Sequence, residues 1–512
     1  MSGWPVTLAL AVAIATIPAQ QRPTFRTSTR LIEVSVVVTG SDGRAVKGLT
    51  QADFVLEEDG KVQPISFFEV HDEGTPPPER GTPLFDVRGG PNLFTNVTPA
   101  TGGVTTVLLF DKLNAAFDSQ YQARRHIDTY LESMRPGDRV ALYALDGSIR
   151  VLHDFTSDAD SLRRAIEIYQ ARVHSDYDAS NEPPAETDGM AVWLVDPATN
   201  VADFFQRKRA TNTLDLLQIL AEHLGGISGR KNLVWVSEAF SIPTNLDRLE
   251  VTEKLRKANR ALSDAQVSVY PVDSRGLVGA HRLGAGGQVM FHTLASVRGK
   301  IETMEIVAEE TGGRVFANTN ALSQSITRAT DDARTMYVLG YYPASSTDGS
   351  FRRIDVKVNR ARVRVRHRSG YRATPPPSRD TGARDKAIKA ALEAPLQSTG
   401  VGLAAETSTS DEGLTVGLRI DPATLTLERQ GTAWRGAVDV LVAQVDASGR
   451  GTVDVSVPLT FSLTDEERTQ ALTRGIEVRH TIALKPRTIQ IRIVARDVAT
   501  GKVGSLVIPS RR

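Results

Sequence analysis

Two hydrophobic patterns alternate along the chain and divide it into regions. The β-branched run Leu31–Thr39 is followed by a Gly-Ser-Asp-Gly turn and by short apolar runs separated by Asp-Gly pairs. This pattern predicts a small antiparallel β module over residues 25–72. Residues 73–103 are dominated by Pro, Gly, Thr and Asn, which is typical of a linker.

From residue 104 onward, continuous apolar runs alternate with segments of helical periodicity. The clearest runs are Val104–Phe110, Arg139–Leu145, Asn232–Ser237 and Val267–Asp273. Fully apolar strands that alternate with helices indicate a parallel sheet with both faces covered. We therefore expect an α/β doubly wound, Rossmann-like domain over residues 104–372, with loop-like insertions at 172–206 and 276–300.

The last third of the chain returns to short strands. Arg362–Arg368 alternates strictly, so its arginines share one strand face, which is either a solvated face or a contact for phosphate or glycan. A Pro-rich linker is predicted at 373–383. Recurrent strands and turn signals over 384–512 predict a C-terminal β-sandwich of immunoglobulin or fibronectin type.

Composition and charge exclude several classes of protein. The 512 residues are 40% hydrophobic, as in soluble globular proteins, and 61 Lys and Arg face 60 Asp and Glu, which gives no global attraction to nucleic acid. The absence of cysteine excludes disulfides and thiolate chemistry. The apolar run within Met1–Ala19 predicts a signal peptide, which is either cleaved or kept as a membrane anchor. No later segment predicts a membrane span, so we expect an exported protein of the periplasm, cell envelope or medium.

Polar residues follow the buried strands, where an open parallel sheet binds its ligands. Asp111 and Asn114 come after the first strand of the predicted sheet, Thr211 precedes a predicted helix, and Glu238 follows another strand. Oxygens from these separate segments could surround a hard cation. The chain shows no Gly-x-Ser-x-Gly or His-Glu-x-x-His sequence, and we expect no catalytic site.

The order of elements and several motifs resemble the von Willebrand factor type A domain, in particular its bacterial VWFA-related group of acidobacterial type. The motifs are Thr106–Asn114, Met134–Leu142, Gly229–Ser237 and Val269–Gly276. The resemblance implies a type A central domain that binds a protein ligand. It also implies a metal-ion-dependent adhesion site, in which Mg²⁺ is held by an Asp-x-Ser-x-Ser loop, a Thr and an Asp.

Matched to that motif, Asp111 is the first Asp, Thr211 is the Thr, and Glu238 stands in place of the third-loop Asp. Leu113 and Ala115 replace the two serines, which should weaken an octahedral Mg²⁺ site severely. The site is therefore degenerate. Either it still holds Mg²⁺, Mn²⁺ or Ca²⁺ with help from Asn114, or it holds no cofactor and these side chains cap the helix or satisfy the loop backbone.

Three functional hypotheses follow. We favour an exported, non-enzymatic adhesion or scaffold protein that binds a protein ligand near Asp111, Thr211 and Glu238. The alternative is a metal-dependent hydrolase that uses carboxylates at the top of the α/β domain, and the third possibility is a purely structural envelope protein. Fold resemblance alone does not decide among them.

Overall fold

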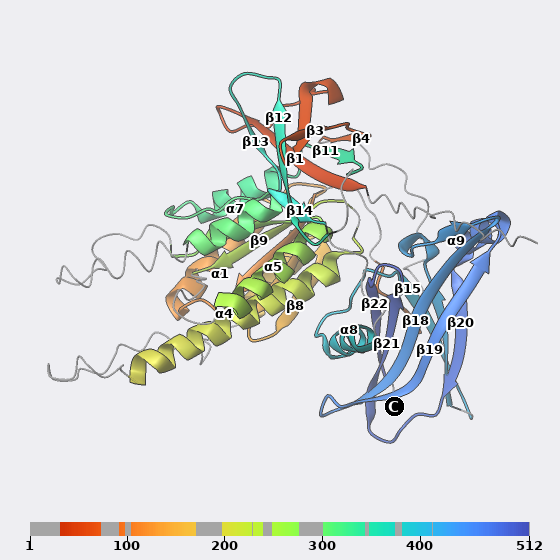
Figure 1. Ribbon diagram of the computed structural model, residues 1–512. Coiled ribbons are helices and arrows are strands. Elements are labelled where there is room, and N and C mark those ends of the chain that lie inside the picture. The colour runs from red at the N-terminus through yellow and green to blue at the C-terminus, as the bar shows by residue number, and fades with distance from the viewer. Residues whose placement is uncertain are drawn as a thin grey trace, which may run out of the picture.

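The computed structural model describes residues 31–72, 92–97, 104–169, 197–227, 229–238, 248–275, 301–343, 348–373, 381–411 and 413–510. The predicted signal segment, most of the first predicted insertion and the second insertion lie outside these described residues. Figure 1 shows a helix-covered sheet between two β-rich units.

A five-stranded sheet forms the centre of the α/β domain. Its strands are β6 (Thr105–Asp111), β7 (Arg139–Leu145), β8 (Ile149–Thr156), β9 (Lys231–Ser237) and β10 (Val267–Asp273), in the order β10-β9-β6-β7-β8. Four strands are parallel, and β8 forms an antiparallel hairpin with β7. Every residue of β6, β9 and β10 is buried, because helices cover both faces of the sheet.

The helices divide between the two faces of this sheet. One core cluster packs α1 (Phe117–Glu132), α2 (Ala159–Ile168) and α7 (Leu322–Asp331) on one face, and a second packs α4 (Pro197–Leu224) and α5 (Arg248–Asp264) on the other. The prediction of a doubly wound α/β domain is confirmed. None of the helices in the described part of the chain is long and apolar enough to cross a membrane.

The N-terminal β module is built from two distant parts of the chain. Its strands are β1 (Ile32–Gly40), β2 (Phe54–Glu58), β3 (Lys61–Gln63), β4 (Phe67–His71), β11 (Met336–Tyr341), β12 (Phe351–Val358), β13 (Val363–Arg366) and β14 (Gly370–Arg372). They form two four-stranded sheets, in the orders β13-β1-β11-β4 and β14-β12-β2-β3.

This pairing corrects the boundary predicted at residue 372. The expected α/β domain included 336–372, but β11 pairs antiparallel with β1 and β4, not with the parallel sheet. The cause is that β11 is apolar on both faces. Tyr337 and Leu339 enter the core of the β module, while Met336 and Val338 pack with Val37 on the other side.

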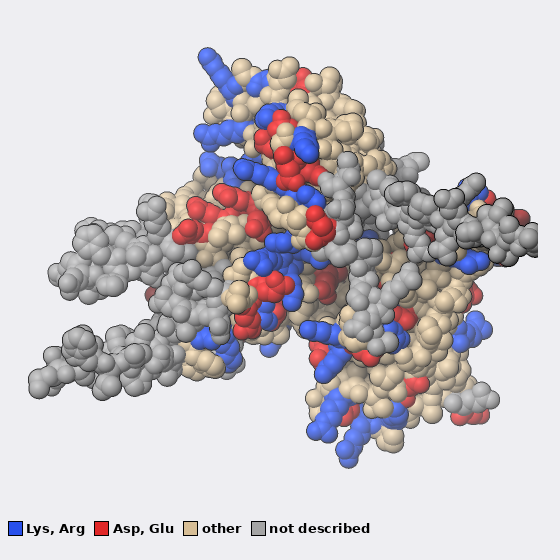
Figure 2. Space-filling view, in the orientation of Figure 1, with Lys and Arg blue, Asp and Glu red and all other residues tan. Residues whose placement is uncertain are grey.

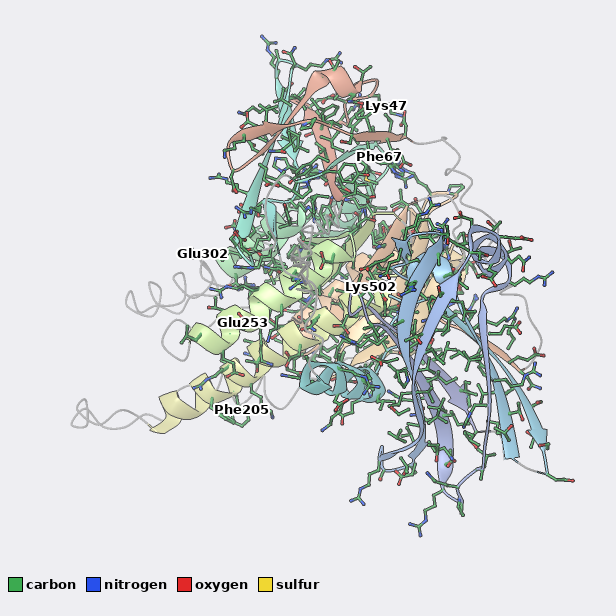
Figure 3. The ribbon with its side chains drawn as sticks, turned by 45° about the vertical axis from the view of Figure 1, so that its right-hand side comes forward. Lys47, Phe67, Phe205, Glu253, Glu302 and Lys502 are labelled. Carbon is green, nitrogen blue, oxygen red and sulfur yellow. The ribbon has the colours of Figure 1, made fainter. Side chains whose placement is uncertain are left out.

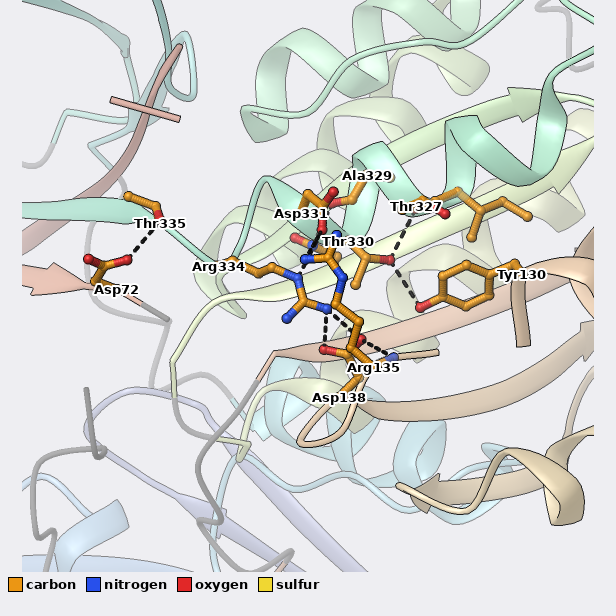
Figure 4. Close-up of polar contacts among 12 residues, drawn as sticks. Asp72, Tyr130, Arg135, Asp138, Thr327, Ala329, Thr330, Asp331, Arg334 and Thr335 are labelled. Carbon is orange, nitrogen blue, oxygen red and sulfur yellow. Dashed lines mark hydrogen bonds and ion pairs between the residues drawn. The ribbon is translucent and has the colours of Figure 1, made fainter. Parts of the chain in front are cut away.

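Ion pairs join the β module to the α/β domain. Arg334, at the start of the return to the β module, donates to Asp138 at 2.7 Å and to Asp331 at 2.9 Å, as Figure 4 shows. Arg366 of β13 makes a two-pronged contact with Asp332 at the end of α7. The Arg366–Asp332 pair joins the two units directly, and because both side chains are largely buried, this contact is specific in geometry.

The C-terminal unit consists of two packed sheets. One contains β5 (Leu93–Thr95), β15 (Leu403–Ser410), β16 (Gly413–Ile420) and β20 (Ile476–Ile482), and the other contains β17 (Glu428–Gln430), β18 (Ala433–Asp446), β19 (Gly451–Leu463), β21 (Thr488–Asp497) and β22 (Val503–Pro509). A single apolar cluster lies between them. Helix α8 (Thr381–Glu393) covers the outer face of β18 and β21, and α9 (Asp465–Arg474) links β19 to β20. The immunoglobulin or fibronectin type of this unit stays a prediction.

Strand β5 corrects the predicted linker at 73–103. It pairs antiparallel with β15, so part of that segment belongs to the C-terminal unit. The Asn96 amide, which is buried, donates to the carbonyls of Ser398 and Val401 and accepts from the Leu403 N–H. This side chain satisfies backbone groups that a sheet ladder leaves unpaired, and it fixes the crossing of the chain.

A second junction holds the C-terminal unit against the end of α4. The Thr399 hydroxyl donates to the His223 carbonyl at 2.6 Å and accepts from the Gly226 N–H at 2.6 Å, so it caps the helix. The His223 ring contacts the Gln397 carbonyl and the Tyr143 hydroxyl at 2.7 Å and 3.0 Å. Burial lowers the pKa of His223, which keeps the ring neutral.

We predict that Gly226→Ala weakens this junction. A Cβ at Gly226 would lie 2.2 Å from the Thr399 carbonyl oxygen, whereas a Cβ at the neighbouring Gly225 would make only ordinary contacts from 3.5 Å. Overpacking of this kind costs about 1–3 kcal/mol. Urea unfolding should show that loss for Gly226→Ala and little change for Gly225→Ala. Equal stability of both variants would contradict the assigned junction.

Candidate functional site

Asp111 lies at the carboxyl end of β6, and none of its surface is exposed. Its carboxylate accepts hydrogen bonds from the Trp235 indole at 2.9 Å and the Ser237 hydroxyl at 2.8 Å, both on β9. It also accepts from the backbone N–H of Asn114 at 3.0 Å and from the Asn114 amide at 2.9 Å. Burial raises the pKa of Asp111, and these four donors oppose that rise.

Asn114 connects this carboxylate to helix α4. The same amide nitrogen that donates to Asp111 donates to the Thr213 hydroxyl at 2.9 Å, and both residues are buried. The predicted association of Asp111 with Asn114 is therefore present in the structure. The two hydrogens of one amide group link two oxygens that come from β6 and α4.

The structure does not bring Thr211 to this network. Its hydroxyl donates to the carbonyls of Arg207 and Lys208 within α4, while Thr213 reaches Asn114. Two residues along a helix point in different directions, and α4 is already helical at 211 because it begins at Pro197. The prediction failed because it placed the start of the helix after Thr211. Thr213 was visible in the sequence as a hydroxyl two positions further on.

Glu238 lies beside the network without contacting Asp111. Its carboxylate accepts the backbone N–H of Ala116 at 2.7 Å and so closes the loop between β6 and α1 from the outside. The sequence placed Glu238 at this edge of the sheet, and the structure places it there. Its partner is a backbone donor of the loop.

Lys112 is a buried cation that sequence reasoning did not consider. Its ammonium pairs with Asp146 at 3.5 Å, and it lies 4.4 Å from the centre of the Tyr169 ring. Burial raises the pKa of Tyr169, so the ring stays neutral. A lysine that directly follows a buried strand was the available signal. Lys112 ties the loop after β6 to the loop after β7.

The groups around Asp111 do not match the ligands that Mg²⁺ requires. Leu113 and Ala115, at the positions of the missing serines, are buried apolar residues, and Leu113 packs in the core beneath α4. Octahedral coordination needs free oxygens, and the Asp111 carboxylate already accepts from protein donors. In the part of the chain that the structure describes, no group of three or more His, Asp or Glu residues could hold a metal ion.

Comparisons with known proteins concern the fold alone. No protein-family model and no curated protein matches the chain. Solved structures similar to this chain include von Willebrand factor type A proteins. A von Willebrand factor type A protein from Catenulispora acidiphila is 10% identical over 94% of this chain and 74% of its own, with a TM-score of 0.24.

Two further solved structures are similar to this chain at comparably low identity. Three N-terminal domains of the type V pili tip protein Mfa5 from Porphyromonas gingivalis are 8% identical over 87% of this chain and 77% of theirs, with a TM-score of 0.26. An aerotolerance-related membrane protein from Bacteroides fragilis is 14% identical over 45% of this chain and 98% of its own, also with a TM-score of 0.26.

We predict that Asp111→Ala destabilises the protein by about 3 kcal/mol, because it leaves four buried donors without their acceptor. Ser237→Ala removes one donor and should cost about 1 kcal/mol. Urea unfolding measures the loss in free energy of unfolding for each variant and so compares the two. A cost of about 1 kcal/mol for Asp111→Ala would instead indicate a simple helix cap.

Proposed function

We propose that the chain is an exported, non-enzymatic protein that binds a protein partner at the carboxyl edge of the α/β sheet without a metal ion. The observation that carries this proposal is a pair of aromatic side chains beside the Asp111 network. Phe117 and Tyr121 lie one turn apart on α1, and 54% of each residue's surface is exposed. Side chains four residues apart share a helix face.

Exposed aromatic residues are the usual energetic centre of a protein interface. Phe117 directly follows Ala116, whose N–H is held by Glu238. The loop beneath the aromatic pair is therefore fixed in place before any partner binds, and a rigid surface lowers the entropy cost of association. Phe204, on the part of α4 that extends away from the sheet, adds a further exposed aromatic side chain next to Phe205, which Figure 3 labels.

The contacts of Asn114 support metal independence. In a metal-dependent adhesion site, the cation offers positive charge to oxygens of several loops. Here the Asn114 amide donates to both Asp111 and Thr213. A neutral amide group therefore links the carboxylate and hydroxyl oxygens that a cation would otherwise link. A cation would have to displace these donors and those of Trp235 and Ser237. The loss of these hydrogen bonds would oppose metal binding, so these contacts favour a loop that binds no metal ion.

The same contacts argue against a hydrolase that uses Asp111 as a base. A general base needs an oxygen within hydrogen-bond reach of the substrate proton. Both carboxylate oxygens of Asp111 accept protein donors, and the side chain is fully buried. We therefore favour the interaction function over an enzyme that uses Asp111 as its base. Export rests on the apolar run of Met1–Ala19.

Metal independence predicts that Mg²⁺ and Mn²⁺ give no saturable heat when titrated into the metal-stripped chain by isothermal titration calorimetry. Asp111→Ala provides the comparison, and a far-ultraviolet circular dichroism spectrum establishes that this variant is folded. Saturable binding to the wild type that is absent from the folded variant would overturn the metal-free mechanism. Partner binding at the proposed face would then involve a bound metal ion.

The partner-binding face predicts site-specific crosslinking. A photoreactive phenylalanine analogue in place of Tyr121 should form a discrete adduct with another protein of the producing bacterium, and EDTA should not reduce it. Ile489, which is similarly exposed but belongs to the C-terminal unit, is the matched control position. Adducts of equal yield from both positions, or none from Tyr121, would refute the proposed face.

A further inference from the structure

The arginines of β13 lie on the face that turns toward the α/β domain. Val363 and Val365 pack in the core of the β module, so Arg364 and Arg366 point to the opposite side of the strand. Arg366 is held by both oxygens of Asp332 at 2.5 Å and 2.7 Å. Arg366 is therefore a largely buried connection between the two units, whereas Arg364, two residues before it, is exposed.

Two more arginines, Arg314 and Arg328, belong to the α/β domain, and the charge of Arg328 acts on Arg314. Arg314 lies with its Nε 3.6 Å from Asp332 and its guanidinium 4.7 Å from the centre of the Phe316 ring. Its Nε is buried and has no hydrogen-bond acceptor. Arg328 lies on α7 one turn before Asp332, and its backbone carbonyl accepts the Asp332 N–H. The four arginines 314, 328, 364 and 366 are called the seam arginines below.

The seam arginines carry more positive charge than their surroundings neutralise. Asp332 contacts two of them, Arg314 and Arg366, and the neighbouring Asp331 is already paired with Arg334 and Arg135. Four guanidinium groups and one carboxylate leave three positive charges. Burial lowers the pKa of Arg314, Asp332 raises it, and the charges of Arg366 and Arg328 lower it further. Within the described part of the chain, Arg328 and Arg364 have no polar partner.

We propose that the seam arginines form a binding site for a phosphate group. A phosphate dianion offers several acceptor oxygens and up to two negative charges, which suits guanidinium groups that donate in pairs. The buried Nε of Arg314 would gain an acceptor, and Arg328 and Arg364 would approach from two different elements. Figure 2 shows Lys and Arg side chains, with Asp and Glu side chains among them, around the end of the molecule where Figure 1 places β12 and β13.

This site is separate from the partner-binding face. It lies between α7 and β13 and uses none of the residues around Asp111. Because Asp332 and Arg328 belong to the α/β domain while Arg364 and Arg366 belong to the β module, a bound phosphate group would contact both units. The phosphate could be a free or soluble ester, or it could be the headgroup of a phospholipid. The chemistry of recognition is the same.

The test is isothermal titration calorimetry of inorganic phosphate into the full chain at low ionic strength. Saturable binding is expected, and the double variant Arg328→Gln/Arg364→Gln should weaken it at least tenfold. These two side chains make no polar contact in the described structure, so the fold should not depend on them. Arg353→Gln is the matched control, because Arg353 is an exposed arginine on β12 and the seam arginines do not include it.

Vesicle flotation separates the two sources of phosphate. If the ligand is a headgroup, vesicles of phosphatidylcholine with phosphatidylglycerol should bind the wild-type chain and should not bind the double variant. Phosphate binding with no vesicle binding assigns the site to a soluble ligand. The proposal is overturned if neither probe binds, or if Arg353→Gln weakens binding as much as the double variant does. The latter result would indicate a general cationic surface.

Discussion

The buried carboxylate of Asp111 is the constraint on which the carboxyl edge of the α/β sheet depends. A charge with no exposed surface needs hydrogen bonds on both oxygens. The donors come from β9 and from the loop that follows β6, and the Asn114 amide extends the network to Thr213 on α4. One side chain therefore fixes two strands, a loop and a helix relative to one another.

The positions of Lys112 and Glu238 follow from this fixed loop. Residues that come directly after Asp111 cannot move far, so Lys112 is directed to Asp146, and Ala116 presents its N–H to Glu238. Helix α1 begins at the next residue, Phe117. The exposed aromatic pair thus stands on a support whose polar groups are satisfied, and that is why we assign it to recognition.

Local patterns predicted the α/β domain because buried parallel strands are continuous apolar runs, such as β6 and β9. They could not predict β5 or the pairing of β11. Three residues, Leu93–Thr95, carry no periodicity, and their partner β15 is about 300 positions away. Strand β11 is apolar on both faces and would suit a parallel sheet equally well.

The candidate site was predictable in its region but not in its detailed contacts. Asp111, Asn114 and Glu238 follow strand ends, and the rule that ligands bind there located them. The choice between Thr211 and Thr213 depends on the phase of α4, which is set by a start at Pro197. The predicted helix began after Thr211, whereas Thr211 lies well inside α4, where its hydroxyl bonds to backbone carbonyls of the helix and Thr213 faces Asn114.

The order of the chain explains why ion pairs join the β module to the α/β domain. The β module takes strands from both sides of the α/β domain in sequence, so the chain must leave the module after β4 and return to it at β11. Arg334 and Arg366 secure that return through Asp138 and Asp332. Replacing either aspartate by an apolar residue would leave a buried guanidinium group without its carboxylate partner. Hence the excess of arginine at this contact supports the fold at Arg366, while Arg328 and Arg364 remain available for a ligand.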